Sequence, residues 1–485
     1  MRRSVCSPFV DYSSTVPAGY PLAGCSSAEP ASVSPTNSDS PPAVTIQKYE
    51  HAFHLVFWDL LKPNADRGSM LVKTILNRIQ KFKGFVYTNV QFEDSSSRRI
   101  IVDIKPRRGS KGRCHKCMKR CSGYDHLEQR LFDFIPIWNI PVLFRYTLRR
   151  VKCPVHGVVV EFLPWAQGKS HLCNSFRVFL AQWGRLLSWQ QVADRFHVSW
   201  DQVYCAIKSV VDWGLEHRDL EHVEAIGVDE ISIGKGSSFA TVVYQIDEHC
   251  RRLLWIGKDR KAKTLLRFFH EFGRERTEKI IAVCSDMWKP YLKVIAKKAV
   301  NAVNVLDRFH IMKMFNDALD KTRRQEVSRL EKDGFEPVLK NTRWLIAKRQ
   351  ENLTAKQRPR LKELLQYNLT SVRAYLLRED FQQFWEYVSP FWAEKFLKEW
   401  IRKAMLSKIE PIKKVARSLR KHSPLILNWF ITRRQYSSGI VEAVNGCAKL
   451  TIRNAHGFRR FETMEYALYH RLGELPMPKS THRFF

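Results

Sequence analysis

The spacing of apolar and polar residues changes several times along the chain and predicts segments of different structure. Residues 1–45 are rich in Ser, Pro, Ala and Thr and hold few large apolar side chains, a composition typical of disorder. In residues 46–104 apolar patterning returns and predicts a helix around 70–82 followed by two strands. Residues 311–435 repeat Leu and Trp at helical spacing, which predicts a large helical segment.

Residues 221–310 alternate strand and helix patterns. Three short runs rich in Val, Ile, Tyr and Trp are separated by polar turns, and they are followed by a helix, a strand, a helix and a last strand. This order of elements is that of a ribonuclease-H-like fold. We therefore expect a multidomain α/β chain. Its ribonuclease-H-like core, a mixed sheet with helices, would be interrupted by the helical insertion 311–435 and completed by a C-terminal helix in residues 436–475, before a short tail at 476–485.

Two carboxylates lie on strands that the predicted core would place side by side. Asp229 lies in the middle of the first strand, where an uncompensated charge costs free energy, and Asp286 follows the fourth strand. These strands are neighbours in the predicted fold, so the two carboxylates can converge at the carboxyl end of the sheet. Converging carboxylates repel each other, and a divalent cation relieves the repulsion; oxygen ligands select Mg2+ or Mn2+. Glu442, in the helix start "SSGIVEAVN", is the candidate third ligand.

Three further polar residues are candidates for supporting positions around these acids. Glu230 follows Asp229 directly in its strand and should point to the opposite face, which makes it a weaker candidate ligand. Asp307 ends the fifth strand and competes as an additional or supporting carboxylate, with His310 close behind it. For any one of these acids alone, a solvated surface position is the competing interpretation. The prediction depends on the agreement between Asp229, Asp286 and the strand order.

Residues 105–170 contain a basic module with two short-spaced pairs of metal-ligand residues. Cys114 and Cys117 form the first pair, and Cys153 and His156 form the second. Such pairs supply the tetrahedral set of a structural zinc, and the strand patterns between them would return the second pair to the first. Small structural cysteines with an unrelated histidine are the alternative, and Cys121 could replace His156 as a ligand. We expect one structural Zn2+.

Residues 171–220 are predicted to be helical, with a helix, a short turn and a second helix. Ser188 and Ser199 stand where two helices should begin, and the second helix should run from about residue 200 to 211. This pattern is that of a helix-turn-helix, whose second helix enters the major groove of DNA. A packed helical hairpin with no DNA contact is the alternative.

The charge balance favours a polyanionic partner. The chain has 81 Lys and Arg against 48 Asp and Glu, a formal net charge of +33, which attracts nucleic acid more plausibly than a membrane surface. No run of about 18 apolar residues exists, so we expect no membrane span. Eleven cysteines, an odd number, fit a reducing compartment. We expect a cytoplasmic protein.

Four stretches of the chain resemble the ISL-three family of bacterial insertion-sequence transposases: "GVDEISIGKG", "SDMWKPYL", "LDRFHIMK" and "SSGIVEAVNGCAKLTIRNAHGFRRF". The resemblance covers roughly residues 100–475 and implies a bacterial protein associated with the nucleoid. It implies an Asp-Asp-Glu transposase whose acids are Asp229, Asp286 and Glu442, holding two divalent ions. Water would attack the phosphodiester at the element end, and the freed 3′-hydroxyl would then attack target DNA. The zinc and helix-turn-helix modules would hold the terminal inverted repeats, and pairing two DNA ends would require a homodimer or a larger assembly.

The expected partner is therefore double-stranded DNA, both transposon ends and target. Candidate DNA contacts come from the basic module, the second helix of residues 171–220 and the basic helix after Glu442: Arg107, Arg108, Lys111, Arg113, Trp200, Gln202, Lys449, Arg453, Arg459 and Arg460. Trp288, beside Asp286, could stack on an extruded base, although a core position is the simpler interpretation.

Two other functions remain compatible with the sequence. A zinc and helix-turn-helix DNA-binding regulator derived from a transposase would bind a specific sequence and cut nothing. A structure-selective nuclease on the same fold would cut DNA junctions without joining strands.

Overall fold

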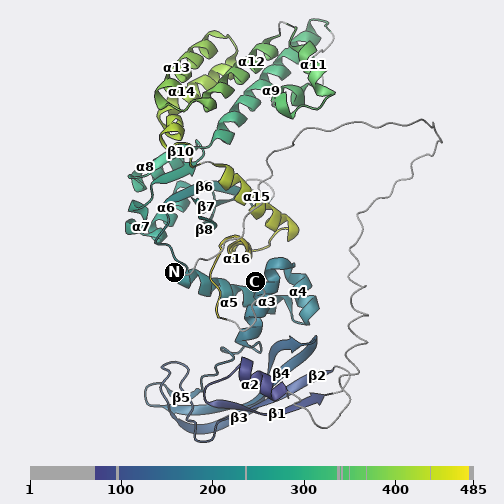
Figure 1. Cartoon of the computed structure of the whole chain (residues 1–485), viewed down its shortest axis with the longest axis vertical. Helices are drawn as coiled ribbons and strands as arrows, with labels where there is room; N and C mark the ends of the chain where they lie inside the picture. The colour runs from purple at the N-terminus through teal and green to yellow at the C-terminus, as the bar shows by residue number, and fades with distance from the viewer. Residues whose placement is uncertain are drawn as a thin grey trace, which may run out of the picture. The chain divides into compact units, whose positions relative to one another are not determined.

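The computed structural model describes residues 72–93, 98–234, 238–335, 339, 342–348, 350–367, 369–436 and 438–479. The predicted disorder of residues 1–45 lies outside these residues, and so does most of the predicted tail. Within the described ranges, no helix has the length and apolar character needed to cross a bilayer. Figure 1 labels the helices and strands.

The first sheet combines segments that the sequence patterns had separated. It follows a short helix, and its order is β1-β2-β4-β3 with β5 paired to β4. These elements are α2 (Val72–Ile79), β1 (Phe85–Glu93), β2 (Arg99–Pro106), β3 (Ser122–Ile137), β4 (Ile140–Cys153) and β5 (Gly157–Val160). Because β2 pairs in parallel with β4, the predicted segments 46–104 and 105–170 contribute to a single sheet. Local apolar patterns carry no signal for such a distant pairing.

Three helices follow the first sheet: α3 (Asn174–Leu186), α4 (Trp189–Phe196) and α5 (Trp200–His217). The predicted helix starts are confirmed, since Ser188 and Ser199 each close a capping box with the glutamine three residues later. His197 ends α4 in the left-handed conformation, with φ of 53°, and so creates the tight turn between the two helices. Helix α5 continues six residues beyond its predicted end.

The second sheet has its first strand in the middle. Its order is β10-β9-β6-β7-β8, where β6, β7 and β8 pair antiparallel and β9 and β10 add in parallel to β6. The strands and the helices between them are β6 (Ala225–Ser232), β7 (Phe239–Asp247), β8 (Cys250–Lys258), α6 (Ala262–Phe272), α7 (Arg274–Glu278), β9 (Ala282–Ser285), α8 (Lys289–Lys298) and β10 (Val303–Leu306). The predicted adjacency of the first and fourth strands is confirmed.

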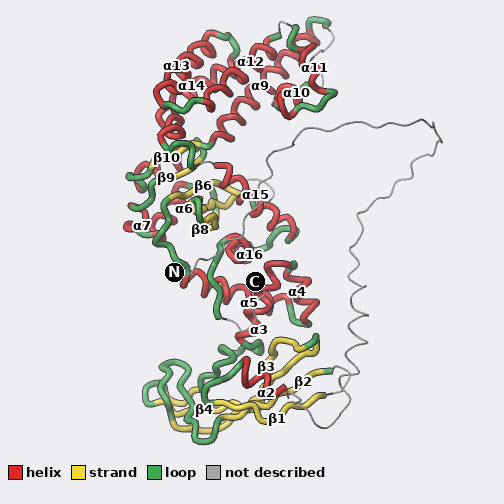
Figure 2. The backbone as a smooth tube through the Cα atoms, viewed as in Figure 1, coloured by secondary structure: helices red, strands yellow, loops and turns green. Residues whose placement is uncertain are grey.

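Along the chain, a long helical segment lies between β10 and α15 (Ser438–Asn454), and Figure 2 draws it as a group of helices. It consists of α9 (Arg308–Lys332), α10 (Arg343–Ala347), η3 (Gln350–Asn352), α11 (Gln357–Leu364), α12 (Thr370–Gln382), η4 (Gln383–Glu386), α13 (Pro390–Leu406) and α14 (Glu410–Ile431). Its core includes Phe315 and Trp400, both almost fully buried, with ring centroids 5.2 Å apart. Helix α9 begins directly after β10, and α14 returns to that strand, where the Asn428 side chain donates to the Asn304 carbonyl at 2.7 Å. The segment therefore leaves and rejoins the same edge of the sheet.

The predicted single C-terminal helix is in fact two helices, α15 (Ser438–Asn454) and α16 (Phe461–Leu472). A turn with Gly457 at φ of 89° separates them, a conformation that favours glycine. Helix α15 packs on β6 and β7, and α16 packs on β8 and on α5. The contact with α5 is polar: the Tyr466 hydroxyl donates to Asp212 at 2.8 Å, and Lys208 lies 3.1 Å from Glu462. The C-terminal helices thus contact both the core sheet and the helices after the first sheet.

Candidate active site

Asp229 and Asp286 lie at the same level of the second sheet. Strand pairing places Val228 opposite Ser285, so Asp229 and Asp286 are the next residues of two adjacent parallel strands. One oxygen of Asp229 accepts the Glu230 backbone N–H at 2.8 Å, and one oxygen of Asp286 accepts the Trp288 N–H at 2.9 Å. Burial raises the pKa of Asp229, and the negative charges of Asp307 and Asp286 add to this rise. A cation at this point would relieve that repulsion.

Asp307 and His310 complete the lining of a small cavity with these two acids. Asp307 is buried at the start of α9, where one oxygen accepts the Phe309 N–H at 2.7 Å and the other lies 2.6 Å from His310 Nδ1. This hydrogen bond is the main cause that raises the pKa of His310. Asp307 and His310, the two residues predicted to support the acids, therefore form a hydrogen-bonded pair that lines the cavity.

Glu442 approaches the cluster from α15. Its side chain lies on an exposed part of the helix, beside buried Val441, which does line the cavity. Burial raises the pKa of Glu442, and the charges of Asp307 and Asp229 contribute in the same direction. The third predicted ligand therefore lies within electrostatic range of the other acids, although it does not line the cavity itself.

Glu230 is not among the residues that line the small cavity, and it meets an arginine that the sequence analysis did not identify. Arg260 lies 2.8 Å from Glu230 and 3.3 Å from Asp286, and its guanidinium stacks over the Trp288 ring at 4.7 Å. Trp288 also packs edge-on against buried Tyr291, which favours the structural interpretation of this tryptophan. Burial, and then the charge of Asp286, raises the pKa of Glu230 to about 7, while Arg260 opposes the shift.

Two more residues beside the acids were missed from the sequence. Asn445 donates from its side-chain nitrogen to Asp229 Oδ2 at 2.5 Å, and its oxygen accepts the Tyr244 hydroxyl at 2.6 Å. A signal for Asn445 was present, since it stands one helical turn after Glu442 and therefore near the same site. No comparable signal existed for Tyr244 or Arg260, which reach the cluster through tertiary packing.

The cysteine module brings its four predicted ligands together. Cys114 and Cys153 each lie 3.6 Å from the His156 ring nitrogen Nδ1, and the sulfurs of Cys117 and Cys153 are 3.6 Å apart. Ligands of a tetrahedral zinc site, at about 2.0 to 2.3 Å from the ion, are themselves roughly 3.3 to 3.8 Å apart. Among the residues that the structure describes, this is the one group of three or more such side chains whose ligand atoms all lie within 4.8 Å of one another.

A buried carboxylate supports the loop that carries the first two cysteines. Glu161 is 2% exposed and forms a two-point ion pair with Arg149, at 2.6 and 2.9 Å, together with a hydrogen bond from Tyr146. Residue 161 also forms a β-bridge with Cys114. Cys121 packs against the same cluster, but His156 rather than Cys121 joins the close group.

The residues predicted to contact DNA fall into two groups: those with accessible basic side chains, and those whose side chains make contacts within the protein. Most are exposed, or half-buried in the case of Arg113, and are open to a phosphate: Arg107, Arg108, Lys111, Arg113, Lys449, Arg453, Arg459 and Arg460. Gln202 instead uses its side-chain oxygen to accept the Ser199 N–H at 2.7 Å. Trp200 is 38% exposed and stacks on Tyr204, with ring centroids 5.7 Å apart. The capping of α5 therefore accounts for the position of the Gln202 side chain, and no DNA contact is needed to explain it.

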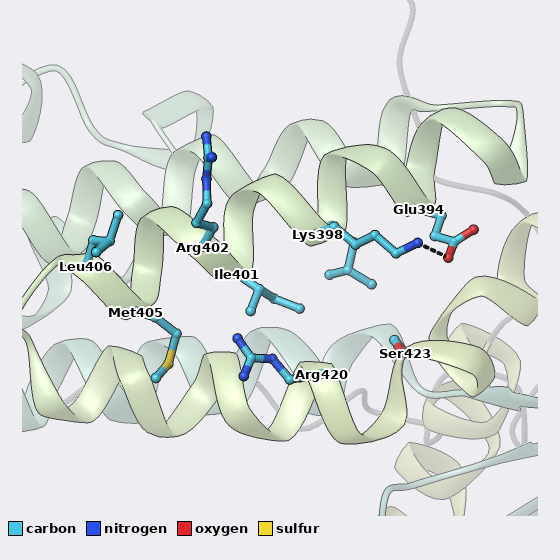
Figure 3. A pocket seen from close by; sticks show the side chains of 9 residues that line it. Glu394, Lys398, Ile401, Arg402, Met405, Leu406, Arg420 and Ser423 are labelled. Carbon is cyan, nitrogen blue, oxygen red and sulfur yellow. Dashed lines mark ion pairs between the residues drawn. The ribbon is translucent and has the colours of Figure 1, made fainter.

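A separate groove of about 400 Å3 lies between α13 and α14, far along the chain from Asp229 and Asp286. Ile401, Met405 and Arg420 point into the space between the two helices (Figure 3). Its one acid, Glu394, is paired with Lys398 at 2.6 Å. Because the groove gathers no set of catalytic groups, the carboxylate cluster is the candidate active site.

Comparisons with known proteins show the family of this chain. The sequence model of an ISL3-type DDE transposase family, described as "Transposase", matches residues 226–468, half of the chain, a range that includes Asp229, Asp286 and Glu442. The chain is 27% identical to the transposase for insertion sequence element IS1001 of Bordetella parapertussis over 393 residues, 80% of this chain and 96% of the relative. It is 26% identical to the transposase for insertion sequence element IS1557 of Mycobacterium tuberculosis over 406 residues, 78% of this chain and 90% of the relative. This chain therefore belongs to the ISL3 family of DDE transposases.

Proposed function

We propose that this transposase cuts and rejoins DNA with Asp229, Asp286 and Glu442 as the ligands of two divalent metal ions. The observation that carries the proposal is the approach of acids from three separate parts of the chain to one end of the second sheet. Asp229 and Asp286 come from adjacent strands, and Glu442 comes from α15 after the helical segment. A shared function explains this arrangement, since acids placed together without a cation destabilise the fold.

The strand arrangement supports the assignment of a ribonuclease-H-like core. Three antiparallel strands are followed by two strands that add in parallel on the far side of the first one. This is the arrangement expected for that fold, with the acids at the carboxyl ends of its central strands. The helical segment 311–435 then corresponds to the predicted insertion, and α15 returns the last acid to the sheet.

The donor set fits a hard divalent cation. All three proposed ligands, and Asp307 beside them, offer carboxylate oxygens, the donors that Mg2+ and Mn2+ prefer. Two bound ions would supply activation of the attacking oxygen and stabilisation of the leaving oxygen in an in-line displacement. Around them, Arg260 holds Asp286 from one side, and His310 orients Asp307 on the other.

The DNA partner is proposed from charge and from the exposed basic residues. Lys449 and Arg453 follow Glu442 by seven and eleven residues on α15, so they share one face of the helix with it. A phosphate backbone lying along that face would pass directly by the acids. The formal net charge of +33 supports the same partner, and binding should weaken steeply with salt.

The cysteine cluster is proposed to hold one structural Zn2+. The distances of 3.6 Å between its ligand atoms match a closed tetrahedral site with no position left for a substrate. In this role Zn2+ fixes the loop with Cys114 and Cys117 onto β4, and so shapes the basic surface around residues 107–113. The zinc module and helices α4 and α5 would then recognise the element ends.

The test is DNA cleavage and strand transfer by the purified full-length protein on DNA that carries the terminal repeats of its element. We expect activity that requires Mg2+ or Mn2+, and a loss of about 10^3-fold or more in Asp229→Asn, Asp286→Asn and Glu442→Gln. Glu248→Gln is the matched control, because it removes an exposed carboxylate in the turn between β7 and β8.

Each alternative function has its own signature in the same experiment. Specific binding to the repeats without any nicking in either metal would identify a regulator. Cleavage of DNA junctions without joining would identify a nuclease. Full activity in Asp229→Asn would show that the acids have been assigned wrongly.

A further inference from the structure

Asn445 connects α15 to two strands, β6 and β7, that lie far from it in the sequence. Asn445 is 4% exposed, and both polar atoms of its side-chain amide form hydrogen bonds. The nitrogen donates to Asp229 of β6, and the oxygen accepts from Tyr244 of β7. Tyr244 is fully buried, and this hydroxyl bond fixes which end of the amide faces Asp229. With the amide reversed, an oxygen would face the carboxylate and repel it.

The Val441 side chain of α15 packs closely against the backbone of β6 at the same place. A Cβ at Gly227 would lie 2.3 Å from the Cγ2 of Val441, so only glycine allows this approach. Val441 immediately precedes Glu442, and Asn445 follows one helical turn later. The buried face of α15, with Val441, Asn445 and Ala448, therefore determines where the exposed face with Glu442 is held.

The hydrogen bonds leave Asp229 with one defined orientation. Its Oδ1 accepts the Glu230 N–H, and its Oδ2 accepts the Asn445 side chain. Each carboxylate oxygen has two lone pairs, so both oxygens can still bind a cation. A neutral amide suits this role better than a lysine or an arginine, because it orients the carboxylate without cancelling its charge.

We propose that Asn445 is a positioning residue of the active site, with Tyr244 acting through it. It orients Asp229 and locks α15 on β6, and so holds Glu442 at the distance that the shared metal site requires. This inference rests on the proposed function of the three acids. A purely structural role is the alternative, in which the Tyr244, Asn445 and Asp229 chain does no more than satisfy buried polar groups.

The test measures metal binding and cleavage separately in the full-length protein. The variants are Asn445→Leu, which keeps the branched shape and the number of heavy atoms but removes the amide, and Tyr244→Phe, which removes one hydroxyl. Tyr469→Phe, on α16, is the matched control, because its buried hydroxyl donates to the Leu254 carbonyl of β8 at 3.4 Å and does not contact the acids of the site. Mn2+ binding is measured by titration calorimetry, cleavage is measured against Mg2+ concentration, and thermal unfolding is followed in parallel.

We expect Asn445→Leu to raise the half-saturating Mg2+ concentration and the Mn2+ dissociation constant by about 10- to 100-fold, as for other groups that orient metal ligands. Tyr244→Phe should give a smaller rise of roughly 10-fold or less. Combining the two changes should add little to Asn445→Leu, because Tyr244 acts only through the amide. Tyr469→Phe should leave both metal constants unchanged, and all variants should bind the terminal repeats as the wild type does.

The outcomes separate this inference from the proposed function. If Asp229→Asn is inactive while Asn445→Leu and Tyr244→Phe keep wild-type metal constants, the acids are catalytic and the positioning role is refuted. A lower unfolding temperature with unchanged metal constants would also refute it, in favour of simple packing. If Asn445→Leu fails to fold, the metal constants of Tyr244→Phe decide the question: a rise supports the positioning role, and wild-type values refute it. If Asp229→Asn remains active, the proposed function itself fails, whatever the other variants do.

Discussion

The chain contains two groups of candidate metal ligands that are assembled in opposite ways. The cysteine and histidine ligands come from two short turns of one module, and their atoms already lie within 4.8 Å of one another. The carboxylates come from β6, β9 and α15, are more widely spaced, and are held by Arg260 and Asn445. Thiols and imidazole can be neutral and pack together as a small core, whereas carboxylates repel and require countercharge or donors.

This difference assigns different roles to the two sites. A closed group of four ligands suits a structural ion that stabilises a fold. A cluster of acids that opens onto a cavity is suited to metal ions that must also contact a substrate. The following experiments test this contrast, starting with the largest expected effect.

Removing the metal from the cysteine cluster should have the largest effect. We expect Cys117→Ser, or a strong zinc chelator, to abolish cooperative unfolding of the first sheet and specific DNA binding, because binding energy at such a site is also folding energy. Metal content by mass spectrometry and near-ultraviolet circular dichroism measure the change. Cys205→Ser, at an exposed cysteine outside the cluster, is the control. A purified protein with no bound zinc and an intact first sheet would contradict the structural role.

A methyl group at the contact between β6 and α15 should disrupt the carboxylate site alone. Gly227→Ala places a Cβ 2.3 Å from Val441, and we expect a destabilisation of about 1 to 3 kcal/mol with loss of cleavage. Gly446→Ala, on the same helix with no atom within 4 Å, should be neutral. Denaturant unfolding and a cleavage assay give the two readouts. Equal behaviour of both variants would show that this contact is unimportant.

Glu230 should make the stability of the metal-free protein depend on pH. Its pKa of about 7 in the folded chain lies above the ordinary 4.5, so the folded state binds more protons between these values. The free energy of unfolding should therefore fall as pH rises from about 4.5 to about 7. Denaturant midpoints across this range should show the slope in the wild type and a smaller slope in Glu230→Gln. Identical slopes would mean that Glu230 does not titrate in this window.

The smallest effect should come from a single phosphate contact. Lys449→Gln should lower the slope of log binding constant against log salt concentration by about 1, with affinity reduced similarly for all sequences. Lys279→Gln makes the same charge change at the carboxyl end of α7, where Lys279 pairs with Glu221, and should leave the slope unchanged. Fluorescence anisotropy at several salt concentrations measures it. An unchanged slope in Lys449→Gln would remove α15 from the DNA contact surface.

The sequence predicted the features that depend on short-range chemistry. Ser188 and Ser199 were recognised as helix starts because a capping residue acts on its own neighbours. The pairing of Cys114 and Cys117 with the later Cys153 and His156 followed from spacing. Asp229 and Asp286 were found because a charge inside an apolar strand is itself a signal.

The features that the sequence did not predict depend on contacts between distant residues. The pairing of β2 with β4, and the position of Arg260 between Glu230 and Asp286, are set by how whole elements pack. The division of residues 436–475 into two helices required a turn at Gly457 that helical periodicity had concealed. Asn445 could have been inferred from its spacing after Glu442, but its partner Tyr244 stands 201 residues away.

The return of α15 to β6 also sets an order of events during synthesis. A chain emerging from the ribosome forms its first sheet, its α4 and α5 helices and both strand acids well before residues 442–445 exist. Until α15 reaches Gly227, the nascent protein has the modules proposed to bind DNA but lacks the last acid of the proposed site. If the proposed function holds, a chain that stops within the helical segment would bind DNA without cutting it and would compete with the complete transposase.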